Sequence, residues 1–284
     1  MKAINLATLL LTFIGYNTYA QEACVIKMVF KQGAKQPLIA QAPNNEGIFK
    51  DLYSEAARRI GCKISISRLP KQRLHLGLEH GQFDFYPAAS FSPKRAEYLY
   101  YIDNGILTAE YGVSDSRLPE ITQLSNLREH SNLIWLMENN SSKQETASLY
   151  GITTQKVAYL NINKLLEFTT TRPKFNYFYV ADKEVIDAFL ARNKNKTLAD
   201  YGLKKHKTCC GKEQPMYIAF SRQSPHLQEE PNAIYNNQVR ITANNQPISL
   251  SIDSVAYQLG QALQEMKYEG VTEEIFNRWY RVKK

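Results

Sequence analysis

The sequence lacks the signatures of several protein classes. After residue 20 it has no apolar run of about 18 or more residues, the length that a helix needs to cross a bilayer. It has no Gly-x-Ser-x-Gly motif, no phosphate-binding glycine loop and no recognisable nucleic-acid-binding module. We therefore expect no membrane span in the mature chain, no nucleic-acid partner and no catalytic site of these kinds.

Metal-binding patterns are also missing. The five histidines show no zinc-binding spacing such as His-Glu-x-x-His, so we predict no metal and no cofactor. We interpret each histidine as a surface residue, at His75, His80, His130, His206 and His226.

Apolar residues are concentrated at the N-terminus in the pattern of a secretory signal peptide. Lys2 precedes an apolar run over residues 4–14, and the small residue Ala20 lies where a cleavage site is expected. We predict that residues 1–20 are removed on export. The mature chain is then expected to be an exported soluble protein, and we expect a monomer.

Cysteine is scarce, with four residues in the chain, and in an exported protein these favour disulfides. Cys24 and Cys62 each open an apolar strand, so their sulfurs start level if the strands are neighbours, and we predict a bridge between them. Cys209 and Cys210 are adjacent, which leaves a vicinal bridge, free thiols or crosswise pairing open. A metal site that includes His206 would lack a second ligand pair at a familiar spacing.

Positive charge exceeds negative charge, with a formal net charge of +8. Much of the excess lies in residues 192–212, which we interpret as a solvated, mobile surface segment. A basic chain is compatible with anionic ligands or surfaces. An alternative is therefore an exported adhesion or envelope-binding module that uses this segment.

Two rounds of alternating strands and helices follow the N-terminal segment. The first round is predicted at residues 24–30, 46–61, 62–69, 71–81 and 82–90. The second is predicted at residues 132–138, 142–151, 155–162, 162–171, 175–181 and 182–193. Strands that alternate with helices favour a parallel sheet with right-handed crossovers. We therefore predict an α/β fold with two lobes, each a mainly parallel sheet flanked by helices.

The two lobes are expected to be joined twice. Residues 101–115 form an extended apolar connection between the rounds, and the extended segment 216–222 precedes two amphipathic helices over 251–281. Those helices need a sheet to cover, and the first lobe provides one if the chain returns to it. The predicted boundaries are 1–20 for the signal peptide, 21–109 with 218–284 for the first lobe, and 110–217 for the second.

Three segments occur in an order and spacing that resemble a known family. They are GIFKDLYSEAARRIG, LEHGQFDFYPAASFSPKRAEYLYY and LGQALQEMKYEGVTEEIFNRWY. They are similar to the Gly-aromatic-x-x-Asp-Leu helix, the Leu-x-x-Gly-x-x-Asp segment with its following arginine, and the closing helices of family 3 extracellular solute-binding proteins, the amino-acid type of ABC importers. The resemblance implies the type II periplasmic-binding-protein fold, with a two-stranded hinge between the lobes.

The resemblance assigns the ligand's carboxylate to Arg95, with Ser90 five residues earlier. A guanidinium presents a planar pair of donors that matches a carboxylate. We expect Ser92 and Pro93 to begin a helix with Arg95 in its first turn, where a cation is unfavourable unless an anion binds there. The alternative is a surface arginine or an ion pair with Glu97.

In the second lobe the resemblance assigns the ligand's amino group to Asp182 and hydrogen bonds to its carboxylate to Ser141 and Ser142. Each of these residues is also suited to an ordinary helix cap. The sequence departs from the family pattern in the insertion 226–250, and in RLPKQR at 68–73, where many amino-acid binders have an aromatic residue.

These observations favour a periplasmic solute-binding protein that captures a small carboxylate-bearing solute, an amino acid or a relative, and carries out no reaction. Its partners would be that solute and a membrane permease or sensor. The alternative is an enzyme on the same scaffold, a dehydratase or lyase acting on a cyclic carboxylate, with an acidic residue near Arg95 as the general acid.

Overall fold

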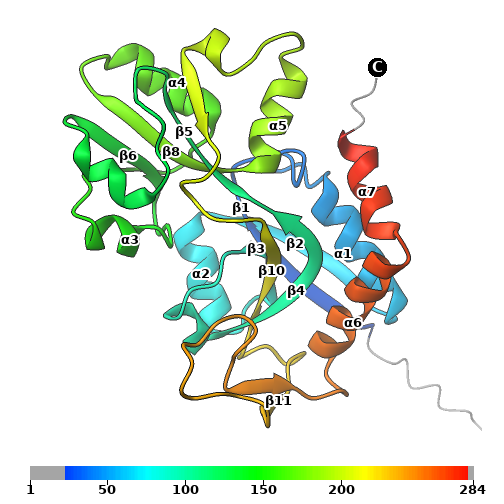
Figure 1. The fold of residues 1–284 in the computed structure, drawn as a ribbon. Coiled ribbons are helices and arrows are strands. Elements are labelled where there is room, and N and C mark those ends of the chain that lie inside the picture. Colours follow the sequence, from blue (N-terminus) through cyan, green and yellow to red (C-terminus); the bar gives the residue numbers. More distant parts are fainter. Residues whose placement is uncertain (1–22, 281–284) are drawn as a thin grey trace, which may run out of the picture.

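Two five-stranded sheets organise the chain in the computed structural model, which describes residues 23–280 (Figure 1). The first sheet has the order β2-β1-β3-β10-β4. Its strands are β1 (Val25–Lys31), β2 (Lys63–Leu69), β3 (Phe85–Ala89), β4 (Leu99–Thr108) and β10 (Gln214–Ser221). Its helices are α1 (Ile48–Arg59), α2 (Lys71–Glu79), α6 (Val255–Tyr268) and α7 (Val271–Tyr280). We call this sheet with its helices the first lobe.

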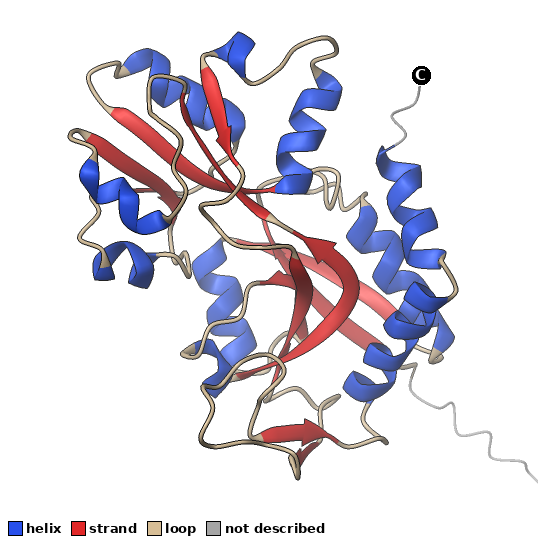
Figure 2. Ribbon diagram, in the orientation of Figure 1, coloured by secondary structure: helices blue, strands red, loops and turns tan. Residues whose placement is uncertain are grey.

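The second sheet has the order β7-β6-β8-β5-β9. Its strands are β5 (Glu110–Asp115), β6 (Leu133–Glu138), β7 (Thr154–Val157), β8 (Asn176–Asp182) and β9 (Leu203–His206). Its helices are α3 (Gln144–Leu149), α4 (Ile162–Thr171) and α5 (Lys183–Arg192), and short 3₁₀ helices lie at Leu124–Glu129 and Ala199–Tyr201. A further 3₁₀ helix, Arg95–Glu97, lies between β3 and β4 of the first lobe. This sheet with α3, α4 and α5 is the second lobe (Figure 2).

Both sheets are mixed. In the first, β1 is parallel to β2 and β3, whereas β10 runs antiparallel to β3 and β4. In the second, β6 is parallel to β7 and β8, whereas β5 runs antiparallel to β8 and β9. The parallel half of each sheet comes from the strand and helix alternation. The antiparallel half comes from segments that pass between the lobes: β4 leads into β5 through Ala109, and β9 leads back towards β10.

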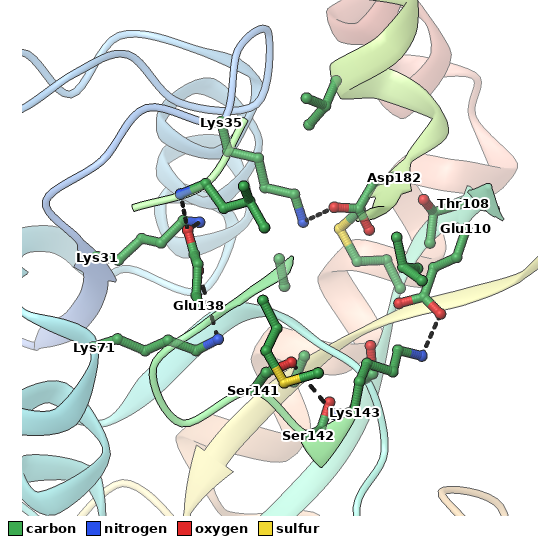
Figure 3. A pocket seen from close by; sticks show the side chains of 18 of the residues that line it. Lys31, Lys35, Lys71, Thr108, Glu110, Glu138, Ser141, Ser142, Lys143 and Asp182 are labelled. Atoms are coloured by element: carbon green, nitrogen blue, oxygen red, sulfur yellow. Dashed lines mark hydrogen bonds and ion pairs between the residues drawn. The ribbon is translucent and has the colours of Figure 1, made fainter. Parts of the chain in front are cut away.

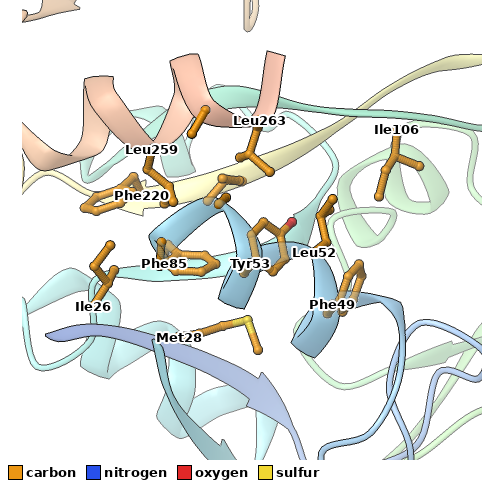
Figure 4. Packing of buried hydrophobic residues seen from close by; sticks show 14 of the residues in the cluster. Ile26, Met28, Phe49, Leu52, Tyr53, Phe85, Ile106, Phe220, Leu259 and Leu263 are labelled. Carbon is orange, nitrogen blue, oxygen red and sulfur yellow. The ribbon is translucent and has the colours of Figure 1, made fainter. Parts of the chain in front are cut away.

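The core of the first lobe follows from alternation along β1. Ile26, Met28 and Phe30 are fully buried and belong to the cluster that α1 and α6 complete, where Figure 4 shows several of these side chains. Val29 points to the opposite face and packs with Leu74 of α2. The sheet is therefore covered on both faces, as parallel pairing requires.

A disulfide joins Cys24 to Cys62. The register of β1 and β2 pairs Val25 with Lys63, so the preceding residues of the two strands lie side by side. This is the bridge expected from the strand positions. A second disulfide joins the neighbours Cys209 and Cys210, the vicinal alternative among those that the sequence left open.

The interpretation of residues 192–212 as a mobile surface segment is wrong in part. Residues 203–206 form the edge strand β9, and both cysteines pack into a buried cluster with Trp135 and Phe178. His206 is fully buried rather than a surface residue. Its Nδ1 accepts a hydrogen bond from the backbone N–H of Ile121 at 3.0 Å, so the ring holds the edge strand against the loop after β5.

Two further expectations about local structure are wrong. The helix expected to begin at Ser92 is only the three-residue 3₁₀ helix Arg95–Glu97, because the chain enters the strand β4 at Leu99. The strand expected over 155–162 ends at Val157, because the side chain of Asn161 accepts a hydrogen bond from Lys164 N and caps α4.

The insertion 226–250 forms a two-stranded sheet of β11 (Glu229–Pro231) and β12 (Ile248–Leu250) beside the first lobe. Its buried residue Gln246 anchors it to β4: Gln246 Oε1 accepts from Tyr101 N at 3.2 Å and Gln246 Nε2 donates to Tyr101 O at 3.1 Å. The predicted signal peptide lies outside the described residues. Within residues 23–280, no helix is long and apolar enough to cross a membrane.

Candidate functional site

A cavity of about 160 Å³ lies between the two lobes. It is lined by the carboxyl end of β1, by α2 and β3 of the first lobe, and by the ends of β6 and β8 of the second (Figure 3). Ligand sites of α/β sheets occur at the carboxyl ends of parallel strands, where polar side chains from several elements meet. The volume lies below the range of roughly 300–1,000 Å³ found for drug-sized ligands, which favours a small solute.

The structure brings all five sequence-predicted ligand residues to this cavity: Ser90, Arg95, Ser141, Ser142 and Asp182. Ser90 and Arg95 come from the first lobe, and Ser141, Ser142 and Asp182 come from the second. Their roles in binding remain predictions.

Asp182 makes an ion pair across the cavity. It occupies the N-cap position of α5, but its side chain does not cap the helix. Instead Asp182 Oδ2 lies 2.6 Å from Nζ of Lys35, in the first lobe. The ordinary-cap alternative for this side chain is therefore wrong.

Lys35 is held in place by the chain around it. It lies in the connection 32–47 between β1 and α1, and its backbone N–H donates to Ile39 O at 2.9 Å. The guanidinium of Arg68, at the end of β2, donates to the carbonyl groups of Gln32 at 3.2 Å and of Ala40 at 2.9 Å. Arg68 thus fixes the connection that carries the lysine.

The other two carboxylates of the cavity are also paired with lysines. Glu138, at the end of β6, lies 2.5 Å from Nζ of Lys31 and 3.6 Å from Nζ of Lys71, both in the first lobe. Glu110, at the start of β5, pairs with Lys143 within the second lobe. Figure 3 shows these pairs around the cavity.

Arg95 has a different kind of partner. Its Nη2 donates to the backbone carbonyl of Asn140 at 2.8 Å, which is a contact between the lobes. Among the ion pairs of residues 23–280 none includes Arg95, so the alternative pair with Glu97 is not formed. The Arg95 guanidinium is half-buried and lines the cavity, and no carboxylate of residues 23–280 forms an ion pair with it.

The charges of the site follow from burial and from these pairs. Burial alone would raise the pKa of Asp182 and of Glu138, but the lysines beside them lower the pKa of both carboxyls below the ordinary value. Burial lowers the pKa of Lys71 to about 8, together with Lys31 and Arg95 and against the pull of Glu138. Burial and the same cationic surroundings lower the pKa of His75 to about 3. At neutral pH Asp182 and Glu138 are ionised, Lys71 is mostly protonated and His75 is neutral.

Several cavity residues were not predicted: Lys31, Lys35, Lys71, Lys143, Glu110 and Glu138. A signal existed for Lys31 and Glu138, because each ends a strand of a parallel pair, where such sites form. The departure RLPKQR also contained Lys71. Lys35 gave no signal, because it lies in an irregular connection that no periodic pattern describes.

Searches with models of protein families and among curated protein sequences found no match. Solved structures do match over almost the whole chain. An ancestral arginine-binding protein bound to arginine superposes with a TM-score of 0.62 at 17% identity, covering 90% of this chain and 97% of that one. The chain has the type II periplasmic-binding-protein fold.

Two further proteins with this fold have the same extent of similarity. The substrate-binding protein of an amino acid ABC transporter gives a TM-score of 0.61 at 14% identity, with 90% of this chain and 99% of that chain covered. The ancestral amino acid-binding protein AncCDT-1, a precursor of cyclohexadienyl dehydratase, gives 0.62 at 11% identity, with 90% and 95% covered. At these identities the periplasmic-binding-protein fold is shared, and the residues of the cavity must be interpreted from their own chemistry.

Proposed function

We propose that this protein binds a small carboxylate-bearing solute in the cavity between its lobes. The observation that carries the proposal is Arg95, a half-buried guanidinium that lines the cavity and has no carboxylate partner among the described residues. A guanidinium that faces a cavity without a carboxylate partner is available to an anion, and a bidentate carboxylate is the partner that suits its planar donors.

We propose that hydroxyl groups from both lobes complete the anion's hydrogen bonds, because Ser90, Ser141 and Ser142 line the cavity. Ser90 follows β3 of the first lobe, and Ser141 and Ser142 precede α3 of the second. A solute that contacts Arg95 and these serines together stabilises the closed arrangement, because the donors converge only when the lobes are closed.

We further propose that the protein is exported and that it presents the solute to a membrane importer or sensor. The proposal is supported by the signal-peptide pattern of residues 1–20 and by the similarity of fold to the substrate-binding protein of an amino acid ABC transporter. We propose the lobe boundaries that the sequence predicted: residues 21–109 and 218–284 for the first lobe, and residues 110–217 for the second.

We propose binding without turnover, because Asp182 and Glu138, two of the carboxyl groups that line the cavity, are poorly suited to act as general acids. A general acid at neutral pH needs a raised pKa. Burial is outweighed at Asp182 by Lys35 and at Glu138 by Lys31 and Lys71, so the pKa of both carboxyls is lowered. Burial does raise the pKa of Glu184, but this residue accepts a hydrogen bond from Thr108 Oγ1 at 2.8 Å and does not line the cavity.

A thermal-shift screen tests the function. The mature chain is heated with amino acids, dicarboxylic acids, aromatic acids and, as a cationic control class, polyamines. A solute at 100 times its Kd adds about 2.7 kcal/mol to the free energy of unfolding. At least one acid is expected to raise the melting temperature, and polyamines are not. No response to any acid would contradict the proposed function, and consumption of the bound acid would favour the enzyme alternative.

A further inference from the structure

The carboxylates of the cavity are already used by the chain. Asp182 is paired with Lys35, Glu138 with Lys31 and Lys71, and Glu110 with Lys143. The pairs of Asp182 and Glu138 are well shielded, with their lysine side chains 14–20% exposed. Breaking a shielded pair leaves a charge without its partner, which is strongly unfavourable.

This occupancy disfavours an ammonium group on the solute. An ammonium placed in the cavity needs a carboxylate, and each one that lines the cavity has a lysine against it. A solute ammonium could pair with Asp182 only by displacing Lys35. The connection that carries Lys35 is held by hydrogen bonds from Arg68, which opposes this displacement. The side chain of Lys35 thus supplies from within the chain the positive charge that an amino acid would bring.

Positive charge remains in excess after this pairing. The residues that line the cavity include five cations, Lys31, Lys35, Lys71, Lys143 and Arg95, and three carboxylates, Glu110, Glu138 and Asp182, which leaves two positive charges without a counter-charge. The excess positive charge can be located from these contacts. Glu138 is shared by Lys31 and Lys71, and Arg95 contacts a backbone carbonyl instead of a carboxylate.

The excess is on the first-lobe wall. His75 lies on α2, and its pKa is lowered first by burial and then by the positive charges of Arg95 and Lys71. Both cations are therefore close to the His75 ring. His75 lines the cavity, and its Nδ1 is buried without a hydrogen-bond partner. An anionic group there would receive two cationic contacts and a neutral ring nitrogen that can donate to it.

We propose that the solute is a small dianion without an ammonium group, with two carboxylates or with one carboxylate and one phosphate or phosphonate. This inference rests on the proposed function and narrows it. Two negative charges compensate the two uncompensated cations. The absence of an amine leaves the pairs of Lys35 with Asp182 and of Lys31 with Glu138 intact.

Calorimetric titration with matched pairs of acids tests the inference. Each pair differs only in the amine: glutamate with glutarate, and aspartate with succinate. Butyrate serves as the monoanion and phosphonoacetate as the phosphonate arm. We expect the amine-free diacid of at least one pair to bind roughly 100-fold more tightly than its amino acid, because an ammonium group would leave a shielded charge of the chain without its partner. Butyrate is expected to bind more weakly than glutarate.

The outcomes separate this inference from the proposed function. Glutamate or aspartate binding as tightly as its amine-free partner would overturn the inference and leave the proposed function standing. If butyrate binds as tightly as glutarate, the inference that the solute carries two negative charges is wrong. If no acid binds, the proposed function fails, and the inference fails with it. Preference for phosphonoacetate would assign the second anionic group to a phosphonate or phosphate.

A variant reverses the expected preference. Lys35→Met leaves the carboxylate of Asp182 free for a solute ammonium, so the ratio of glutarate affinity to glutamate affinity should fall by at least tenfold. Lys50→Met removes an exposed lysine of α1 and should leave the ratio unchanged. Melting curves confirm folding of both variants, and Lys35→Gln replaces Lys35→Met if the latter does not fold. An unchanged ratio in a folded Lys35 variant would contradict the role of this lysine.

Discussion

The two walls of the cavity carry opposite charge. The first lobe contributes Lys31, Lys35, Lys71 and Arg95, whereas the second contributes Glu110, Glu138 and Asp182 with a single lysine, Lys143. Three of the four first-lobe cations make their ion pairs with the opposite wall. The two lobes are therefore joined directly by ion pairs. In the proposed function, the solute neutralises the part of the cationic wall that the acidic wall leaves unpaired.

Removal of the cation without a counter-ion should have the largest effect on binding. Arg95→Ala is expected to reduce affinity for the acid found in the screen by about 30-fold to several thousand-fold, equivalent to roughly 2–5 kcal/mol. The melting temperature of the free protein should hardly change, because within residues 23–280 the Arg95 side chain donates only to the carbonyl of Asn140. Titration calorimetry and melting curves measure both. Arg73→Ala, on the exposed side of α2, is the control. A lower melting temperature with unchanged affinity would make Arg95 a structural residue.

The lobes also differ in how their disulfides act on stability. The Cys24–Cys62 bridge spans a sequence separation of 38, so replacing both cysteines by serine should lower the free energy of unfolding by about 3–4 kcal/mol. The Cys209–Cys210 bridge joins neighbours and closes the shortest loop, so its chain-entropy contribution is the smaller one. Denaturant unfolding of the two double variants compares them. An equal or larger loss on the second-lobe side would contradict the chain-entropy account.

A steric block can separate lobe closure from charge. A Cβ added at Gly33 of the first lobe would lie 2.3 Å from Cδ2 of Tyr159 in the second. Gly33→Ala should therefore oppose closure, with a cost of about 1–3 kcal/mol, or about 5-fold to 150-fold in affinity. Solution scattering should show a larger radius of gyration. Adding Tyr159→Ala removes the obstacle and should restore affinity; failure of this rescue would locate the defect elsewhere.

The smallest expected effect is a pH dependence of binding. Lys71 has a pKa of about 8 in the free protein, lowered first by burial, and a bound anion should raise it. Affinity should therefore be highest below pH 8 and should fall as the pH rises above 8. The fall should be at most about tenfold per pH unit, and it should end at the pKa of Lys71 in the complex. The groups that act on Lys71 are Lys31, Arg95 and Glu138, and His75 beside it is neutral in this range. Lys71→Arg should flatten the profile, and a slope that persists in this variant would assign the titration to another group.

The fold was accessible from the sequence because local patterns and topology agree. Alternating strands and amphipathic helices predicted two parallel units, and the strand positions of Cys24 and Cys62 predicted their bridge. The antiparallel strands β9 and β10 were harder to place, because their pairing depends on how the chain returns between lobes. Arg95 was expected in a helix and lies in a single 3₁₀ turn. Its placement at the cavity comes from the loop after β3 and not from a helix.

The chemistry of the cavity was only partly accessible. Arg95 and Asp182 were predicted from motif position, and the cavity contains both. The partner of Asp182 was not predicted, because an ion pair between Lys35 and a residue of the other lobe depends on the tertiary structure. Sequence patterns identify which residues end a strand, but they do not specify which charges face each other across a cavity.

The ion pairs that cross the cavity also bear on how the lobes would move. Lys31 with Glu138 and Lys35 with Asp182 join the two lobes directly. If the proposed solute enters and leaves by a movement of the lobes, both pairs have to separate as the lobes open and form again as they close. The same two pairs would then oppose opening for entry and opening for release.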